Sequence, residues 1–375
     1  MSVFDDVDLI DHHCHGLLSG PVSDEEFRVF STEADVLSDA GLETLDSPLG
    51  LAIRKVCAPI LDLERHAPID AYLARRSELG SVEVNQRLMA AARTSTLLID
   101  TGFVGSRLLS PEGMHDAFGV ETHTIVRLES VAEAVAPTST SATFIADLRE
   151  ALATAAATAV GFKSIIAYRF GLDLEDTAPS PARVETAVAA WIETASETGN
   201  WRVSDPAILQ HLLWEAVTFQ LPIQIHVGYG DADLELFRSD PTRATRFFRA
   251  TQNSGAKFTL LHCYPYERES AVLSQIFPHV YCDVGSVSHF MGPSAFTTIR
   301  HVMEIAPFNK ILYSSDAHAL AEQYVISAGS WRDGMQRLMD EWIESDWLRA
   351  YDAARFVEMI ANGNAARIYG LGDAA

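Results

Sequence analysis

The strongest constraint on the fold of this chain is a succession of short apolar runs, separated by segments long enough to hold a helix. Unbroken stretches such as FTLLH (258–262) are typical of strands buried on both faces, as in parallel sheets. Because consecutive parallel strands need a crossover, which is usually a helix, the pattern predicts alternating strands and helices. Eight runs are rich in Val, Ile and Leu: 7–11, 96–100, 123–128, 160–166, 221–227, 257–262, 279–284 and 311–315.

Helix signals fall between these runs. Asp205 can cap a helix that has Pro206 at its first position, and this helix is expected to end before Leu221. The segments 267–277 and 293–306 are predicted to be helices that return the chain to the next strand. Eight strand and helix alternations favour an α/β architecture, the (β/α)₈ barrel, which takes about 250 residues as one unit plus insertions.

One barrel domain is expected to span residues 1–375. The long segment 17–95 separates the first two runs and contains helical pieces such as 23–42, so it is predicted to be a helical insertion over the barrel mouth. The segment 331–371 has helical periodicity throughout. It is expected to pack against the outside of the barrel and to close the fold.

The charge balance restricts the binding partners. Lys and Arg total 28 against 51 Asp and Glu, a formal net charge of −23 that repels nucleic-acid phosphates and anionic lipid. The start of the chain has no basic leader, and no run reaches the ~18 apolar residues of a spanning helix. We therefore expect a cytoplasmic enzyme that acts on a small molecule, without nucleic acid or membrane partners. A homodimer is expected only because it is the commonest assembly of soluble enzymes.

Polar side chains stand where the predicted strands end. In a barrel these ends converge on one site, where the chemistry is placed. His13 and His15 form a His-x-His pair, and alternate residues of an extended segment point to the same side, so both imidazoles can bind one cation. Imidazoles with a carboxylate suit Zn²⁺ or another late first-row divalent ion. The other candidates are Lys163 in the fourth run, His226 after the fifth, His262 after the sixth and Asp316 after the eighth.

Structural interpretations compete for some of these residues. A single histidine at a strand end is more often structural than a ligand, but four histidines and an aspartate in register along a barrel point to a metal site. His12 should face away from His13 and is interpreted as structural. Cys14 and Cys263 should face the helix layer, where a small buried hydrophobe fits better than a reactive thiolate.

The order His-x-His, Lys, His, His, Asp across strands one, four, five, six and eight resembles the amidohydrolase superfamily of metal-dependent barrel hydrolases. The stretches LLHCYPYERES, VYCDVGSV, ILYSSDAHALAEQY and NGNAARIYGL resemble its amidohydrolase-related branch (amidohydrolase 2), which includes the amidohydrolase half of FluG-type proteins. The resemblance implies that His13, His15 and Asp316 hold one ion. It implies that His226 and His262 hold a second ion, or serve as ligand and electrophile in a one-metal site. Zn²⁺ is the expected metal, with Mn²⁺ or Fe²⁺ as alternatives.

The resemblance also implies a mechanism. A bound metal lowers the pKa of water and polarises the scissile carbonyl. Asp316 is then the general base that becomes the general acid toward the leaving amine, and His262 assists it. Lys163 has two interpretations, because an ammonium cannot ligate a metal. It is either carboxylated to a carbamate that bridges two ions, or it pairs with a substrate carboxylate or with Asp316.

Substrate contacts are expected from residues beside the metal ligands. Arg169 could bind a substrate carboxylate, Tyr168 precedes it, and His318 could hydrogen-bond a substrate oxygen. Arg127, Glu129 and Asp283 are expected at the same mouth.

The predicted activity is hydrolysis of an amide or other non-peptide C–N bond in a small carboxylated substrate, for example a γ-glutamyl or N-acyl amide. The alternative is a metal-dependent non-oxidative decarboxylase of the same superfamily, whose members usually replace part of the strand-one pair by an acidic residue. A binding module without turnover would have lost Asp316 or a ligand, and none is missing.

Overall fold

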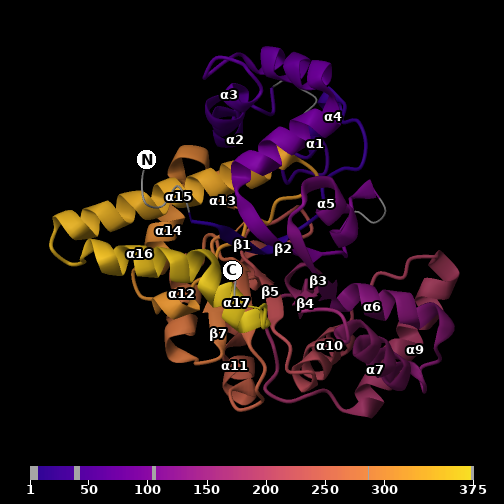
Figure 1. The fold of residues 1–375 in the computed structure, drawn as a ribbon. Helices are drawn as coiled ribbons and strands as arrows, with labels where there is room; N and C mark the ends of the chain where they lie inside the picture. The colour runs from indigo at the N-terminus through magenta and orange to yellow at the C-terminus, as the bar shows by residue number, and fades with distance from the viewer. Residues whose placement is uncertain (1–6, 38–42, 104–106, 286, 373–375) are drawn as a thin grey trace.

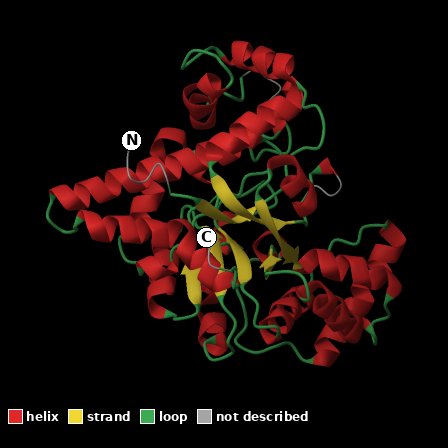
Figure 2. Ribbon diagram, in the orientation of Figure 1, coloured by secondary structure: helices red, strands yellow, loops and turns green. Residues whose placement is uncertain are grey.

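A computed structural model describes residues 7–37, 43–103, 107–285 and 287–372. At its centre, parallel strands form one curled sheet in sequential order, and helices surround it (Figures 1 and 2). The strands are β1 (Leu9–Cys14), β2 (Thr94–Asp100), β3 (Glu121–Arg127), β4 (Gly161–Ser164), β5 (Ile223–Val227), β6 (Phe258–His262) and β7 (Val280–Cys282). The seven strands coincide with seven of the predicted runs and confirm the α/β barrel fold.

The eighth run, 311–315, is not a regular strand, and that prediction was wrong in detail. This segment nevertheless occupies the gap between β7 and β1. The Leu312 amide donates to the Cys282 carbonyl at 3.0 Å, and the Asp316 amide donates to the His13 carbonyl at 3.0 Å. Within this run Ile311 makes one bridge, to Cys282, and the residues after it form no continuous ladder. Asp316, which follows the run, has φ 51°, in the left-handed region outside β geometry. The barrel is thus closed by scattered backbone hydrogen bonds.

The predicted crossover helices are present. Asp205 caps α10 (Pro206–Thr218) by accepting a hydrogen bond from the Ala207 amide at 2.7 Å. The segment 267–277 forms α12 (Glu267–Ile276), and 293–306 forms a 3₁₀ turn followed by α14 (Ala295–Met303). The remaining crossover helices are α5 (Pro111–Phe118), α6 (Leu128–Val135), α7 (Phe144–Ala156), α8 (Ile166–Arg169), α9 (Pro181–Thr198), α11 (Thr245–Thr251) and α13 (Val287–Phe290).

The segment between β1 and β2 is helical and lies together at the top of Figure 1. It contains α1 (Asp24–Val29), α2 (Pro48–Ala52), α3 (Ala58–Ile60) and α4 (Ile69–Ala92). Of the expected helical piece 23–42, only α1 is helical among the described residues, and 38–42 lie outside them. α4 is interrupted at Gly80, whose φ of 77° and ψ of 155° are not helical.

The end of the chain forms α15 (Ala321–Glu344), α16 (Ala350–Glu358) and α17 (Asn364–Tyr369). α15 contacts α4 and α14 on the outside of the barrel, as expected. α17 differs from the prediction, because Ile368 and Tyr369 pack with Ile10, Leu98 and Ile125 of the first three strands. It therefore closes the end of the barrel opposite the strand C-termini. None of the described helices has the length and apolar character needed to cross a bilayer.

Candidate metal centre

A cavity of about 210 Å³ opens at the C-terminal ends of the strands and gathers most of the predicted site residues. Of the nine predicted ligands and substrate contacts, all but His13 line it, and His13 contacts Asp316 directly. The lining residues are His15, Glu33, Phe103, Arg127, Lys163, Ile165, Tyr168, Arg169, Arg202, His226, Asp231, Asp233, His262, Asp316 and His318.

Three side chains converge closely enough to share one ion. His13 Nε2 lies 3.0 Å from Asp316 Oδ1, and His15 Nε2 lies 3.4 Å from the same oxygen. One ligand atom from each residue falls within 4.8 Å of the others. In the part of the chain that the structure describes, this is the group with the spacing of a metal site.

Hydrogen bonds behind the two imidazoles set their orientation. His13 Nδ1 donates to Gln224 Oε1 at 2.8 Å, and His15 Nδ1 donates to the Asp100 carbonyl at 2.9 Å. Each donation leaves the Nε2 lone pair directed at Asp316, which is the tautomer a metal needs. Burial also lowers the pKa of His13 to about 3, so the imidazole is neutral. The sequence reasoning missed Gln224, although it precedes His226 by two residues in β5 and so shares its side.

The other two histidines hold nitrogens without partners. The rings of His226 and His262 have centroids 4.6 Å apart, and His262 Nδ1 lies 3.5 Å from Asp316 Oδ2. Within the described residues, His226 Nε2 and His262 Nδ1 are buried and make no hydrogen bond. Burial lowers the pKa of both, that of His262 to about 4. Neutral buried imidazoles with unshared lone pairs fit a metal ion, since most buried polar atoms otherwise find a partner.

Asp316 is held ionised. Burial alone would raise its pKa, but His262, His13 and His15 together keep the pKa of this carboxyl well below its ordinary value. Both Asp316 (φ 51°) and His262 (φ 69°) lie in the left-handed region, where non-glycine residues are rare and concentrate at functional sites. Both residues line the cavity.

Lys163 reaches the same point from β4. Its Nζ lies 3.2 Å from His13 Nε2 and is almost fully buried, and burial lowers its pKa to about 8. Nearby, Arg127 Nη2 and Asp100 Oδ2 form an ion pair of 2.6 Å, so the charge of Arg127 is already matched. Lys163 is therefore a buried amine beside the metal ligands.

The substrate side of the cavity carries charges of both signs. Arg169 has a side chain 10% exposed and an Nη2 3.4 Å from Glu133, while its Nε and Nη1 have no partner among the described residues. The Tyr168 ring packs on His226, with centroids 4.3 Å apart. Glu33 comes from the segment between β1 and β2, and burial, with Asp316 and Asp231 nearby, raises its pKa to about 8. The sequence carried no signal for Glu33, because its position depends on how that segment folds.

Two residues expected at the mouth lie elsewhere. Asp283 is fully buried and accepts hydrogen bonds from His12 Nε2 at 2.8 Å and from the His262 amide at 2.5 Å, so it positions the His262 backbone. Glu129 accepts hydrogen bonds from Ser164 Oγ and the Ile165 amide. Neither lines the cavity: Asp283 and one oxygen of Glu129 are hydrogen-bonded to the structure around it, while Glu129 Oε2 is buried without a partner among the described residues.

The cysteines do not take part. All four are buried and free, and burial raises the pKa of Cys14 and Cys263 well above the ordinary thiol value. A thiolate at either position is therefore disfavoured.

A comparison with models of protein families assigns the chain to a family. Residues 102–371 match the family model described as amidohydrolase. The chain belongs to the amidohydrolase family. This amidohydrolase is 26% identical to the FluG protein of Emericella nidulans over 97% of its own length and 46% of FluG, so it spans about half of that relative.

Solved structures resemble the amidohydrolase over its full length. One is a protein of Lactobacillus casei ATCC 334 whose metal-dependent hydrolase function is itself an inference. It is 28% identical, with 98% of this chain and 96% of that chain covered and a TM-score of 0.83. A uronate isomerase of Bacillus halodurans C-125 shares the fold at 13% identity and a TM-score of 0.64, over 98% and 94% of the two chains.

Proposed function

We propose that this amidohydrolase hydrolyses an amide or other non-peptide C–N bond of a small carboxylated substrate with one or two divalent ions, first of all Zn²⁺. One observation supports this most strongly: lone-pair atoms of His13, His15, His226 and His262 are directed at one cavity that also contains an ionised carboxylate, Asp316. Neutral imidazoles and a carboxylate are the ligands that zinc hydrolases use.

The residues divide the reaction between them. A divalent ion bound here would supply water of lowered pKa and polarise the scissile carbonyl. Asp316, ionised and in contact with the ligand set, accepts the proton that water loses as its oxygen attacks the carbonyl carbon. It returns that proton to the amine nitrogen as the C–N bond breaks. His262 stands beside it, 3.5 Å from Asp316 Oδ2, where it can ligate a second ion or orient the carbonyl oxygen.

The cavity favours a small substrate with two charged ends. The guanidinium of Arg169 lines the cavity and suits a substrate carboxylate, because charge-assisted pairs of this kind are strong. Asp231 lines the same cavity and suits a substrate ammonium, whereas Glu33, whose pKa burial raises to about 8, suits a neutral hydrogen-bonding group of the substrate. A volume of about 210 Å³ leaves room for an amino-acid-sized group, as in a γ-glutamyl or N-acyl amide. His318 and Tyr168 would contact its neutral part.

Lys163 has two candidate roles here. Its Nζ is close enough to His13 Nε2 that a carbamate formed on it with CO₂ would reach the ligand set. As a free ammonium it would instead pair with the substrate carboxylate or Asp316. Intact-protein mass and metal content of the wild type and of Lys163→Ala distinguish the roles. A carbamate bridge predicts the added mass of a carboxyl group and a loss of metal in the variant.

The activity test is a panel of γ-glutamyl amides and N-acyl amino acids, assayed for amine release by the metal-loaded enzyme and by Asp316→Asn. We expect hydrolysis of at least one member and a fall of about 100-fold or more in kcat for the variant. Unchanged turnover by Asp316→Asn would contradict the assigned role. Aromatic carboxylates belong in the panel, because CO₂ release from one of them would favour a decarboxylase instead.

A further inference from the structure

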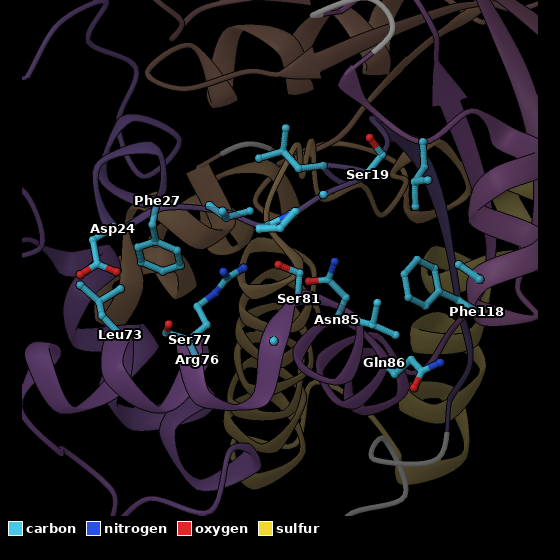
Figure 3. A pocket seen from close by; sticks show the side chains of 18 of the residues that line it. Ser19, Asp24, Phe27, Leu73, Arg76, Ser77, Ser81, Asn85, Gln86 and Phe118 are labelled. Atoms are coloured by element: carbon cyan, nitrogen blue, oxygen red, sulfur yellow. The ribbon is translucent and has the colours of Figure 1, made fainter.

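A second and larger cavity lies beside the barrel, between the connection that follows β1 and the helices α1, α4 and α5 (Figure 3). Its volume is about 710 Å³, within the range of pockets that bind small organic molecules. None of its lining residues lines the metal cavity. The two cavities are therefore separate, and the proposed hydrolysis makes no use of this one.

A buried guanidinium, ion-paired on one side with Glu322, supplies hydrogen-bond donors to the wall of this cavity. Arg76 is only 5% exposed, and its Nε donates to Glu322 Oε1 at 2.8 Å. Among the described residues this is its one hydrogen bond, so the two terminal NH₂ groups have no protein acceptor. Figure 3 shows the guanidinium directed into the cavity, between Phe27 and Ser81. Arginine is suited to two parallel hydrogen bonds with a carboxylate, and both donors are available here.

Further polar groups stand next to Arg76 along α4. The break at Gly80 puts Ser77 and Ser81 on either side of a non-helical residue, and both line the cavity. Asn85, one turn on, is 8% exposed and has an Oδ1 without a hydrogen-bond partner among the described residues. This oxygen is closed off from the cavity, so the donors that a ligand can reach on this wall are the NH₂ groups of Arg76, with Ser77 and Ser81 beside them.

Much of the remaining cavity wall is apolar, although Ser19 and Gln86 also line it, and its acidic groups are at the rim. Asp24 and Asp116 are exposed to solvent, so water and salt screen them, whereas Arg76 lies inside. An anion that enters past the rim therefore meets the two NH₂ groups of Arg76, which have no protein acceptor although Glu322 matches the charge of the guanidinium. The apolar surface is contributed by Leu18, Val22, Phe27, Leu73, Leu109 and Phe118.

We propose that this cavity is a second ligand site, which binds a small organic carboxylate with an apolar body. The carboxylate takes the two NH₂ groups of Arg76, and the apolar body fills the region around Leu18 and Phe118. The site needs no metal ion, and its occupation is independent of the reaction at Asp316.

The test is calorimetric titration of the full-length, metal-loaded protein with 4-phenylbutanoate and with its primary amide. We expect the carboxylate to bind about tenfold more tightly than the amide, because hydrogen bonds between charged groups are the stronger ones. Ser81→Phe fills the cavity without touching the ion pair and should abolish binding. Ser330→Phe, at a half-buried serine of α15, is the matched control and should bind normally.

A second variant tests the proposal in case Ser81→Phe fails to fold. Arg76→Gln combined with Glu322→Gln removes both charges of the buried pair, so no unpaired charge remains, and it should lower the affinity about tenfold. Absence of millimolar binding by the wild type would overturn the proposal. Equal affinities for the carboxylate and its amide would also overturn the proposal. Binding that persists in Ser81→Phe but is lost in His13→Ala would overturn it too, because the ligand would then occupy the metal centre. A change of oligomeric state in Ser81→Phe would identify the cavity as a contact between copies and overturn it as well.

Discussion

Replacing Gln224 by leucine should weaken metal binding although Gln224 is not a ligand. Its Oε1 accepts the Nδ1 hydrogen of His13 at 2.8 Å, and its Nε2 donates to the His12 carbonyl at 2.6 Å. Leucine is similar in volume but leaves His13 free to rotate and to change tautomer. Loss of such a partner typically costs 10–100-fold in metal affinity. This corresponds to about 1.4–2.8 kcal/mol of binding free energy.

The same substitution has a separate cost in folding. It leaves the His12 carbonyl and the His13 Nδ1 hydrogen buried without a partner, and each unsatisfied group costs about 1–3 kcal/mol. Gln224→Glu is the matched control, because it keeps an acceptor for His13 and loses only the donor. A carboxylate in that place makes the imidazole a stronger ligand, so metal affinity should be maintained or rise while stability falls.

The measurement is competition for Zn²⁺ between the metal-free protein and a chromophoric chelator, with urea unfolding of each variant in parallel. We expect the two variants to lose stability together and to diverge in metal affinity. If folded Gln224→Leu binds Zn²⁺ as tightly as the wild type, the orientation of His13 by Gln224 is not what prepares the site.

Three further predictions concern stability and acid response. Tyr369→Phe removes a hydroxyl that forms hydrogen bonds with His12 Nδ1 at 3.0 Å and with Gln224 Nε2 at 2.9 Å. The substitution should lower the free energy of unfolding by about 1–3 kcal/mol, and an unchanged midpoint of urea unfolding would contradict this. Arg76→Gln alone leaves the Glu322 carboxylate buried without its ion-pair partner and should lower the free energy of unfolding by about 3–5 kcal/mol. Adding Glu322→Gln should restore most of that free energy, which thermal unfolding of the two variants would measure. Burial, and then Lys310, lowers the pKa of His279 to about 4, so the unfolded chain binds a proton that the native protein does not. The contribution of neutral His279 to the free energy of unfolding is therefore complete above about pH 6.5 and is lost as the pH falls toward 4. In His279→Leu, urea unfolding at several pH values should show a weaker dependence of stability on pH over this range.

The sequence predicted which strand-end side chains meet in one cavity, because in a barrel the ends of successive strands are arranged around one axis. His226 and His262 follow buried strands, so the parallel geometry alone brings them to one cavity. Gln224 escaped notice because an amide carries no metal-binding signal by itself. Glu33 escaped because no periodicity fixes how a long segment between two strands folds back.

Other errors have similar physical causes. The run 311–315 is apolar enough for a strand, but within it only Ile311 forms a bridge, and a pairing reduced to scattered hydrogen bonds cannot be read from composition. The periodicity of 331–371 predicted helices correctly, but not which end or side of the barrel each would cover. The position of α17 depends on Tyr369, because the hydroxyl of this residue forms hydrogen bonds with His12 and Gln224 inside the barrel.

The closure of the barrel between His13 and Asp316 has a consequence for how the protein acquires its metal in a cell. These ligands flank nearly the whole barrel sequence, so a ribosome has to deliver all of β1 to β7 before they can meet. An early nascent chain offers the His13–His15 pair, and His226 and His262 follow before Asp316 does, so the complete set of His13, His15 and Asp316 forms only when the barrel closes. We therefore expect the ion to enter a cavity that has already folded, where coordination geometry and the metal available at that moment decide its identity.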